Sequence, residues 1–379
     1  MSQLQGLALA RHLAENREVR PRQLKEEGKT VIGCLCCFAP PEIMHAAGVV
    51  PYRITGRPGE STSEVDGYLE PFGCPYVRSV FAQSFKGSLD FLDGLVISHS
   101  CDMVQRLYGI WTYYRPCSYN RMINVPHQLF PWSRDFYYRE LVFFKESLEE
   151  FMQVKITPGE IKASIELYNR IRALIRKLNS LRGGESPKLL SSELMEVLLA
   201  GEVLPPEEFL PLLQEVVQEV ETRQSLAGYD SRVMVWGSIL DHPMFYRIIE
   251  EAGGQVVADD TCLGARFWNE DVLLTEDPVE GLVQHYLLDF QCPRTDRGAG
   301  EERFEYLRER AEEYGVDGVI GYIISFCDPH KFDYPDLRDY LKKQGLPMLL
   351  IEDNYSFQSA GAISTRLQAF LEMLPGKSC

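Results

Sequence analysis

The chain has 379 residues, of which 45% are hydrophobic, so it is long enough to build two or three domains with buried cores. Its 55 acidic side chains outnumber its 39 basic ones and give a formal net charge of −16. This charge disfavours nucleic acid or an anionic membrane as the main partner, because either would be repelled at long range.

The chain starts with a short apolar run that is charged on both sides, a pattern typical of an amphipathic helix and not of a cleaved export signal. No run approaches the roughly 20 apolar residues of a membrane span. We therefore expect a cytoplasmic protein. Since disulfides are rare there, the ten cysteines are expected to be free thiols or metal ligands and not a disulfide scaffold.

Short strand-like runs alternate with helical stretches at both ends of the chain, which is the pattern of βαβ units. The early runs are 30–36, 49–55, 94–101 and 122–127, and the late runs are 232–239, 254–260, 318–327 and 347–354. Several are continuously apolar, as in a parallel sheet covered on both faces. The predicted fold class is α/β, with two Rossmann- or flavodoxin-like parallel-sheet domains.

The segment between these two groups of strands carries helix signals only. Thr157, Pro158 and Glu160 predict a helix start with a capping box, and apolar residues follow at helical spacing from Leu167 to Leu178. We expect this segment to be a helical insert packed on the domains. The predicted parts are an N-terminal α/β domain at 1–135, a helical segment at 136–228 and a C-terminal α/β domain at 229–379.

The two α/β parts share a series of landmarks. In each, a helix begins near a proline and ends in Ala-Gly, and then come a strand, a Cys-Pro pair and an Asp-Gly strand that leads to a serine and Cys-Asp. The shared order indicates a duplicated half-unit, in which Cys74 corresponds to Cys292 and Cys101 to Cys327. Because ligands bind at the carboxyl ends of parallel strands, Cys101 and Cys327 would meet in one cleft if the domains face each other.

Three kinds of thiol chemistry fit such a cleft to different degrees. Structural zinc usually takes ligands paired as CxxC knuckles, whereas these landmark cysteines come singly from separate loops. A catalytic cysteine needs one thiol and a base, which leaves the other landmark cysteines unexplained. An iron–sulfur cluster takes several thiolates from dispersed loops and fits best.

Several motifs occur in order along the chain: "GCLCCFAPPEIMHAAGVVPYRITG", "GCPYVRS", "SHSCD", "DGVIGYIISFCDP" and "TRLQAFLEML". Together they resemble the 2-hydroxyacyl-CoA dehydratase and benzoyl-CoA reductase subunit family. The resemblance covers nearly the whole chain, and the middle helical segment matches least.

This resemblance implies an anaerobic enzyme whose two α/β domains hold an iron–sulfur cluster between them. It implies that the family's ligand positions fall on Cys36, Cys74, Cys101 and Cys327. It also implies that electrons come from a separate iron–sulfur activator ATPase. The chain itself lacks the GxxxxGK[ST] signature of nucleotide hydrolysis, so the ATP belongs to that partner.

The cysteines near these motifs outnumber the three that a single [4Fe-4S] cubane takes in this family. The surplus resembles the double-cubane-cluster reductase branch, in which two cubanes joined by one sulfide form an [8Fe-9S] cluster with six thiolates. The six ligands that we expect on this basis are Cys36, Cys74, Cys101, Cys117, Cys292 and Cys327.

The remaining cysteines are assigned other roles. Cys37 is the alternative to Cys36, because adjacent residues on a strand point to opposite faces. Cys34 shares a face with Cys36 but lies deeper in the strand. Cys262 is expected to be a small packed thiol, and Cys379 an exposed one.

Reduction of a substrate also needs protons, and the candidate donors are Glu42, His99 and His330. Each also has an ordinary explanation. Glu42 lies in the first turn of a predicted helix, where a carboxylate stabilises the N-terminus. His99 alternates with serines on a strand and suits a packed histidine, while His330 is expected in a loop.

Three functions from different classes remain. The first is an ATP-dependent reductase of small molecules at a double-cubane cluster. The second is a dehydratase or reductase subunit that acts on a CoA thioester with one [4Fe-4S] cluster. The third is an electron-transfer or cluster-scaffold protein. The duplication and the family suggest a homodimer, and the activator ATPase is the expected protein partner.

Overall fold

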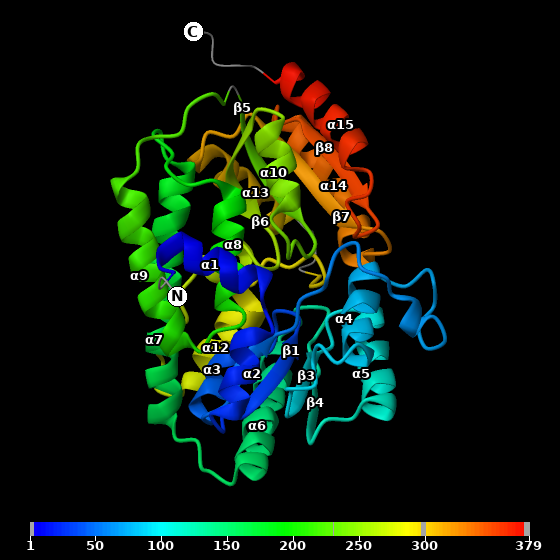
Figure 1. Cartoon of the computed structure of the whole chain (residues 1–379), viewed down its shortest axis with the longest axis vertical. Coiled ribbons are helices and arrows are strands. Elements are labelled where there is room, and N and C mark those ends of the chain that lie inside the picture. Colours follow the sequence, from blue (N-terminus) through cyan, green and yellow to red (C-terminus); the bar gives the residue numbers. More distant parts are fainter. Residues whose placement is uncertain (1–3, 230, 297–300, 375–379) are drawn as a thin grey trace.

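The structure is a computed structural model in which residues 4–229, 231–296 and 301–374 are described. It contains two four-stranded sheets, both entirely parallel, one above the other in Figure 1. The first sheet consists of β1 (Val31–Leu35), β2 (Val50–Arg53), β3 (Gly94–Ser98) and β4 (Tyr119–Ile123). The second consists of β5 (Ser231–Gly237), β6 (Gly254–Asp260), β7 (Gly318–Ile324) and β8 (Met348–Asp353).

The two sheets have the same topology. The strand order is β2-β1-β3-β4 in the first and β6-β5-β7-β8 in the second. In each sheet the strand order changes direction between two neighbouring strands, β1 and β3 in the first sheet and β5 and β7 in the second. Flavodoxin-like folds bind their ligands at this switch point. The predicted α/β class with two similar parallel-sheet domains is confirmed, and all eight predicted strands are present. The largest error is at β4, which begins three residues before the predicted run.

Burial explains why these sequences form parallel strands. Every residue of β1, β3 and β7 is buried, which matches the continuous apolar runs in their sequences. Around the first sheet lie α2 (Val19–Glu26), α3 (Pro41–Ala46), α4 (Pro75–Phe85), α5 (Asp102–Tyr114) and a short 3₁₀ turn at Ser63–Val65. Around the second lie α10 (Met244–Glu251), α11 (Ala265–Trp268), α13 (Glu301–Glu313), α14 (Asp328–Lys343) and α15 (Ala360–Met373).

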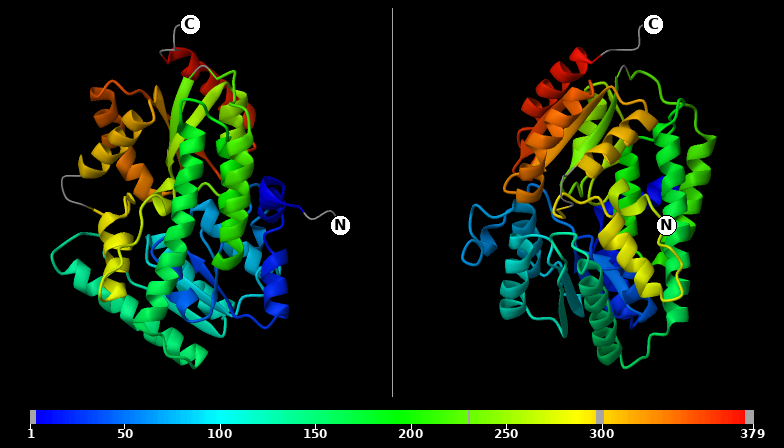
Figure 2. Two further views of the ribbon diagram at one scale, coloured as in Figure 1. Left: turned by 90° about the vertical axis from the view of Figure 1, so that its left-hand side faces the viewer. Right: turned by 180° about the vertical axis from the view of Figure 1, so that it is seen from behind.

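The segment between the sheets is helical, as predicted. It contains α6 (Ser133–Met152), α7 (Pro158–Gly183), α8 (Ser191–Gly201) and α9 (Pro206–Thr222), and α1 (Gly6–Glu15) packs on α8 and α9. The expected capping box is present, because Thr157 accepts from the Glu160 backbone and Glu160 accepts from the Thr157 backbone. Helix α7 runs beside both sheets in Figure 2 and contacts α3 at one level and β6 at the other.

One stretch of the second half returns to the first. After β6 the chain forms α12 (Pro278–Val283) and a π-helical turn at Gln284–Asp289, and both pack against α6. The halves are also joined by a buried polar contact, in which Arg17 donates to Thr55 Oγ1 and to the Asp241 carbonyl oxygen. One hydrophobic core therefore extends through both halves and the helical segment. None of the described helices is both long and apolar enough to cross a membrane.

Candidate iron–sulfur site

Six thiols line one cavity between the two halves, at the carboxyl ends of the strands. Chain position explains most of this convergence, because five of the six follow a strand or precede a helix at the sheet edge that faces the other half, while Cys292 follows the π-helical turn. Three come from the first half and three from the second: Cys36, Cys74, Cys101, Cys262, Cys292 and Cys327.

Three of these thiols cap helices. Cys74, Cys101 and Cys327 are the N-cap residues of α4, α5 and α14. None of the three sulfurs accepts a capping hydrogen bond, and burial raises the pKa of each thiol, a rise that the nearby backbone of the first helical turn partly offsets. The positive end of the helix dipole favours a thiolate at the same place, so these positions suit anionic sulfur.

Two residues at the cavity have an unusual backbone. Cys36 has φ of 70° and Phe326 has φ of 64°, both in the left-handed region. Each follows a strand of the switch point, β1 or β7, and lines the cavity. A non-glycine residue in this region costs energy, and such costs concentrate at functional sites. The strained turn at Cys36 places its thiol at the cavity.

Burial controls the ionisation of most of these thiols. Desolvation raises the pKa of Cys74 to about 11, of Cys101 to about 12 and of Cys292 to about 12. Cys36 differs, because hydrogen bonding to Cys37 and to Ser100 lowers its pKa to about 6. Thiolate ligation by the first three thus requires a metal that displaces their protons.

The arrangement differs from that of a site for a single metal ion. Within the described residues, no three His, Cys, Asp or Glu side chains are grouped around one ion position. The six sulfurs are distributed instead around the walls of a shared cavity. All are soft donors, which iron–sulfur clusters require. The chemistry of this donor set therefore fits an iron–sulfur group.

The structure brings together five of the six cysteines in the predicted ligand set, but Cys117 lies elsewhere. It precedes β4 and so stands at the amino end of that strand, at the opposite edge of the sheet from the cavity. There it lines a separate pocket with Trp111 and Arg115. The sixth place at the cavity is taken by Cys262, which was expected to be an ordinary packed thiol.

A sequence signal for Cys262 does exist. It lies two residues after the end of β6, at the same sheet edge as the other thiols. Its counterpart after β2 in the first half is Thr55, so a search for matching cysteines in the two halves misses it. A cysteine's position just after a strand is therefore a better indicator that it lines the cavity than a matching cysteine in the other half.

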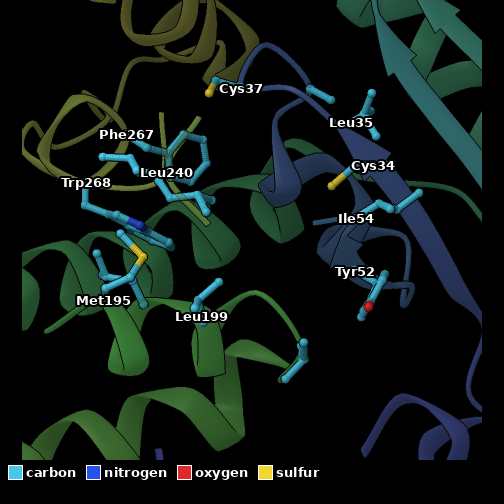
Figure 3. Close-up of a cluster of buried hydrophobic side chains, with 14 of the residues drawn as sticks. Cys34, Leu35, Cys37, Tyr52, Ile54, Met195, Leu199, Leu240, Phe267 and Trp268 are labelled. Carbon is cyan, nitrogen blue, oxygen red and sulfur yellow. The ribbon is translucent and has the colours of Figure 1, made fainter. Parts of the chain in front are cut away.

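Cys34 and Cys37 are both buried and belong to the hydrophobic cluster in Figure 3. Neither is among the residues that line the cavity. Cys34 lies in β1 among apolar side chains, and burial raises its pKa to about 12. The Cys37 sulfur lies 3.3 Å from the carbonyl oxygen of Cys262 and 2.9 Å from Nη2 of Arg53. Cys36 is accordingly the better placed of the two alternatives. Cys379 lies outside the described residues.

Of the three candidate proton donors, His330 alone lines the cavity. It is buried in the first turn of α14, not in a loop, and its Nδ1 lies 3.4 Å from Cys327 Sγ. Its Nε2 lies 3.4 Å from Arg266 Nη1. Burial lowers the pKa of His330 well below its usual value, so it is a neutral imidazole.

The other two candidates lie away from the cavity lining. Glu42 is fully buried, pairs with Arg172 at 2.6 Å and accepts from the Tyr286 hydroxyl at 2.9 Å. This network joins α3, α7 and the π-helical turn, which is a structural role. His99 follows β3, is only partly buried, and its ring centroid lies 5.1 Å from that of His127. Neither placement supports the predicted proton-donor role.

A larger cleft of about 760 Å³ adjoins the cysteine cavity and shares Ser100, Cys101, Arg294, Asp328 and Pro329 with it. Its described lining has six aspartates against two arginines and one lysine. One of the arginines, Arg303, is paired with Asp333. The other, Arg294, is buried and donates to backbone carbonyls. The approach to the thiols is therefore acidic.

Comparisons with known proteins agree on one family. Residues 36–374 match the family described as 2-hydroxyglutaryl-CoA dehydratase, D-component. The chain is 30% identical to a subunit of benzoyl-CoA reductase from Thauera aromatica, over 86% of this chain and 87% of that one. It is 27% identical to the beta subunit of lactoyl-CoA dehydratase from Anaerotignum propionicum, over 92% and 93%.

A third relative is the beta subunit of (R)-2-hydroxyglutaryl-CoA dehydratase from Acidaminococcus fermentans, 27% identical over 92% of this chain and 94% of that one. These relatives are subunits of a reductase and of dehydratases, which confirms the predicted family resemblance and the prediction of an enzyme. The chain belongs to the 2-hydroxyglutaryl-CoA dehydratase D-component family.

Proposed function

We propose that the protein is a low-potential reductase of small molecules that works at a double-cubane [8Fe-9S] cluster. A separate iron–sulfur activator ATPase would supply the electrons. The observation that supports this most directly is the even division of the cavity thiols, three from each half. The family resemblance implies three thiolates per cubane, so each half would hold one cubane.

The proposed ligands are Cys36, Cys74 and Cys101 for one cubane and Cys262, Cys292 and Cys327 for the other. When bound, the cluster would supply electron storage close to a reducible substrate. The chain's own residues would hold it, and three of the sulfurs belong to the N-cap residues of helices, where the helix dipole favours a thiolate. His330 is the proposed polar group at the cavity wall, where its ring contacts Cys327.

The charge of the adjoining cleft supports a small substrate without multiple negative charges. With a volume of about 760 Å³ the cleft is large enough for many ligands, so size alone does not select among them. Its excess of aspartates disfavours the phosphates of CoA, which would be repelled on approach. We expect a compact, neutral or cationic reducible molecule.

A second candidate function is favoured by the relatives themselves. The curated proteins that match are named as subunits of enzymes that act on CoA thioesters. In that case the chain would hold one [4Fe-4S] cluster and associate with a different homologous subunit. A third candidate, electron transfer without substrate, would show neither substrate binding nor turnover.

The deciding experiment is a determination of iron and acid-labile sulfide on protein purified without oxygen. The proposal expects about eight irons and nine sulfides per chain, and about four of each would favour the CoA-dependent subunit. Light scattering on the same sample tests the expected homodimer. Turnover of a small substrate with the activator and ATP, beside a reaction without ATP, then separates a reductase from an electron carrier.

A further inference from the structure

We infer that Arg53 is a positioning residue that fixes a permanent positive charge against the cysteine cavity and thereby raises the reduction potential of the group bound there. The inference rests on the proposed iron–sulfur site and adds a residue to it. Arg53 is the last residue of β2, is not one of the predicted site residues, and is 5% exposed.

Arg53 connects the two halves behind the residues that line the cavity, close to Cys36 and Cys262. Its Nη2 donates to the Cys37 sulfur at 2.9 Å and to the Cys262 carbonyl oxygen at 3.1 Å. Cys37 follows the ligand Cys36 in the first half, and Cys262 belongs to the second. The guanidinium also lies 4.9 Å from the ring centroid of Phe267, which fixes its plane.

No carboxylate among the described residues forms an ion pair with this guanidinium. Its Nε and Nη1 are buried and have no hydrogen-bond partner. The nearby acid is Glu202, but it accepts from the Arg53 backbone N–H through its own backbone oxygen. Glu202 Oε1 is itself buried without a hydrogen-bond partner, so this carboxyl lies near the guanidinium and raises its pKa through space but does not pair with it directly.

Two kinds of buried arginine occur in the molecule: Arg17 and Arg294, like Arg53, donate to groups other than carboxylates, whereas others form ion pairs. Arg172, Arg182 and Arg266 are equally inaccessible, and each is paired with a carboxylate: Glu42, Asp259 and Asp260. An unpaired buried charge is costly in a low-dielectric interior. The groups that act most on the Arg53 charge are Cys37 and Glu202, with Cys36 also contributing, and an anionic cluster in the adjacent cavity would add to this counter-charge.

A fixed cation beside the cluster has a defined electrostatic consequence. Reduction adds negative charge to the cluster, and a positive charge nearby stabilises the reduced state more than the oxidised state. Arg53 would thus raise the reduction potential and ease the entry of electrons. The guanidinium itself stays protonated at all relevant pH values.

The test is a reductive titration followed by EPR on anaerobically purified protein that contains iron. We compare the wild type with Arg53→Met, Arg53→Lys and the control Arg57→Met. Arg57 is also cationic and nearby in sequence, but it is partly exposed and pairs with Glu18. Iron per chain and the far-UV circular dichroism spectrum are recorded for each variant.

We expect Arg53→Met to titrate at a more negative potential than the wild type, with Arg53→Lys between them and Arg57→Met unchanged. An Arg53→Met protein with full iron and an unshifted potential would overturn the inference. If Arg53→Met folds but loses its iron, retention of iron by Arg53→Lys supports charge compensation, and loss in both variants contradicts it.

This inference and the proposed function fail in distinguishable ways. A wild-type count of about four irons would reject the double cubane, yet the potentials of the variants would still report on Arg53. Conversely, about eight irons in every variant with identical potentials would keep the double cubane and remove Arg53 from the site.

Discussion

The two α/β halves have the same strand order but place their thiols differently. In the first half the strand β1 is followed by Cys36, whereas in the second half β5 is followed by Ser238, which also lines the cavity. The second half gains its third thiol after β6 at Cys262. What the halves share is therefore a set of strand ends that face one cavity, and any of these ends can carry a ligand.

The halves also differ in how they neutralise buried arginine near the thiols. In the second half Arg266 is paired with Asp260 and lies 3.5 Å from the Cys262 sulfur. In the first half Arg53 has no carboxylate partner among the described side chains and contacts Cys37. Arg266 is thus balanced by a carboxylate of its own half, whereas Arg53, like the cavity-lining Arg294, forms no ion pair among the described side chains.

The largest expected effect distinguishes Cys262, which lines the cavity, from Cys117, which was a predicted ligand but lies elsewhere. Cys262→Ser should lose about half of the iron per chain, because one cubane loses a thiolate. Cys117→Ser, at the opposite edge of the sheet, is the matched control and should keep all its iron. Iron analysis of anaerobically purified protein measures both. Equal iron in the two variants would break the assignment of three ligands to each half.

The next largest effect is expected on stability, at the ion pair between Asp260 and Arg266 in the second half. Asp260→Asn leaves Arg266 buried without a counter-charge and should destabilise the protein by about 3–5 kcal/mol. Asp271→Asn is the control, since its pair with Arg176 is exposed and should contribute only about 0–1 kcal/mol. Urea unfolding of cluster-free, reduced protein measures the two. A small effect of Asp260→Asn would mean that the halves do not differ in charge balance.

A pH effect is expected at Glu202, beside Arg53. Burial raises its pKa from 4.5 to about 7. The folded protein therefore holds this proton more tightly than the unfolded chain, and the stability that the proton contributes is lost as the pH rises from 4.5 through 7.

Glutamine cannot ionise, so the Glu202→Gln variant does not lose this stability at high pH. The free energy of unfolding of the variant, minus that of the wild type, should therefore be about 2 kcal/mol larger at pH 8 than at pH 5. Urea unfolding at both pH values is the measurement. A pH-independent difference would show that the carboxyl is ionised in the folded state and balances Arg53 after all.

The smallest effect lies outside both halves. Thr157→Ala removes the capping box of α7 and should cost about 1 kcal/mol. Iron per chain should not change, because no cavity residue belongs to this helix. Loss of iron in this variant would show that general destabilisation, and not ligand removal, lowers the iron content of the cysteine variants.

The sheets were predictable because their strands are short, apolar and bounded by turn residues. The error at β4 has a clear cause, since Tyr119, Asn120 and Arg121 do not form a continuous apolar run. That error also explains the misplacement of Cys117. A strand predicted at 122–127 leaves the cysteine in an undefined loop, whereas the observed start at Tyr119 puts it at the amino edge.

The site was predictable as far as it follows from strand ends and helix starts. Cys74, Cys101 and Cys327 precede helices in sequence, and their convergence follows from parallel topology. Arg53 and the burial of Glu42 were not predictable, because both depend on contacts between segments distant in the chain. Arg172, for example, reaches Glu42 from a helix that begins more than a hundred residues later.

Helix α7 gives the molecule a further property. It has 26 residues and is therefore about 39 Å long, and it contacts elements of both halves. At its end Gly183 allows close packing on the Val257 backbone, where any larger residue would clash. By packing against both halves, the helix holds them, and with them the cavity walls, at a fixed spacing. With the walls fixed, gain or loss of an electron would require little nuclear rearrangement, a condition that favours fast electron transfer.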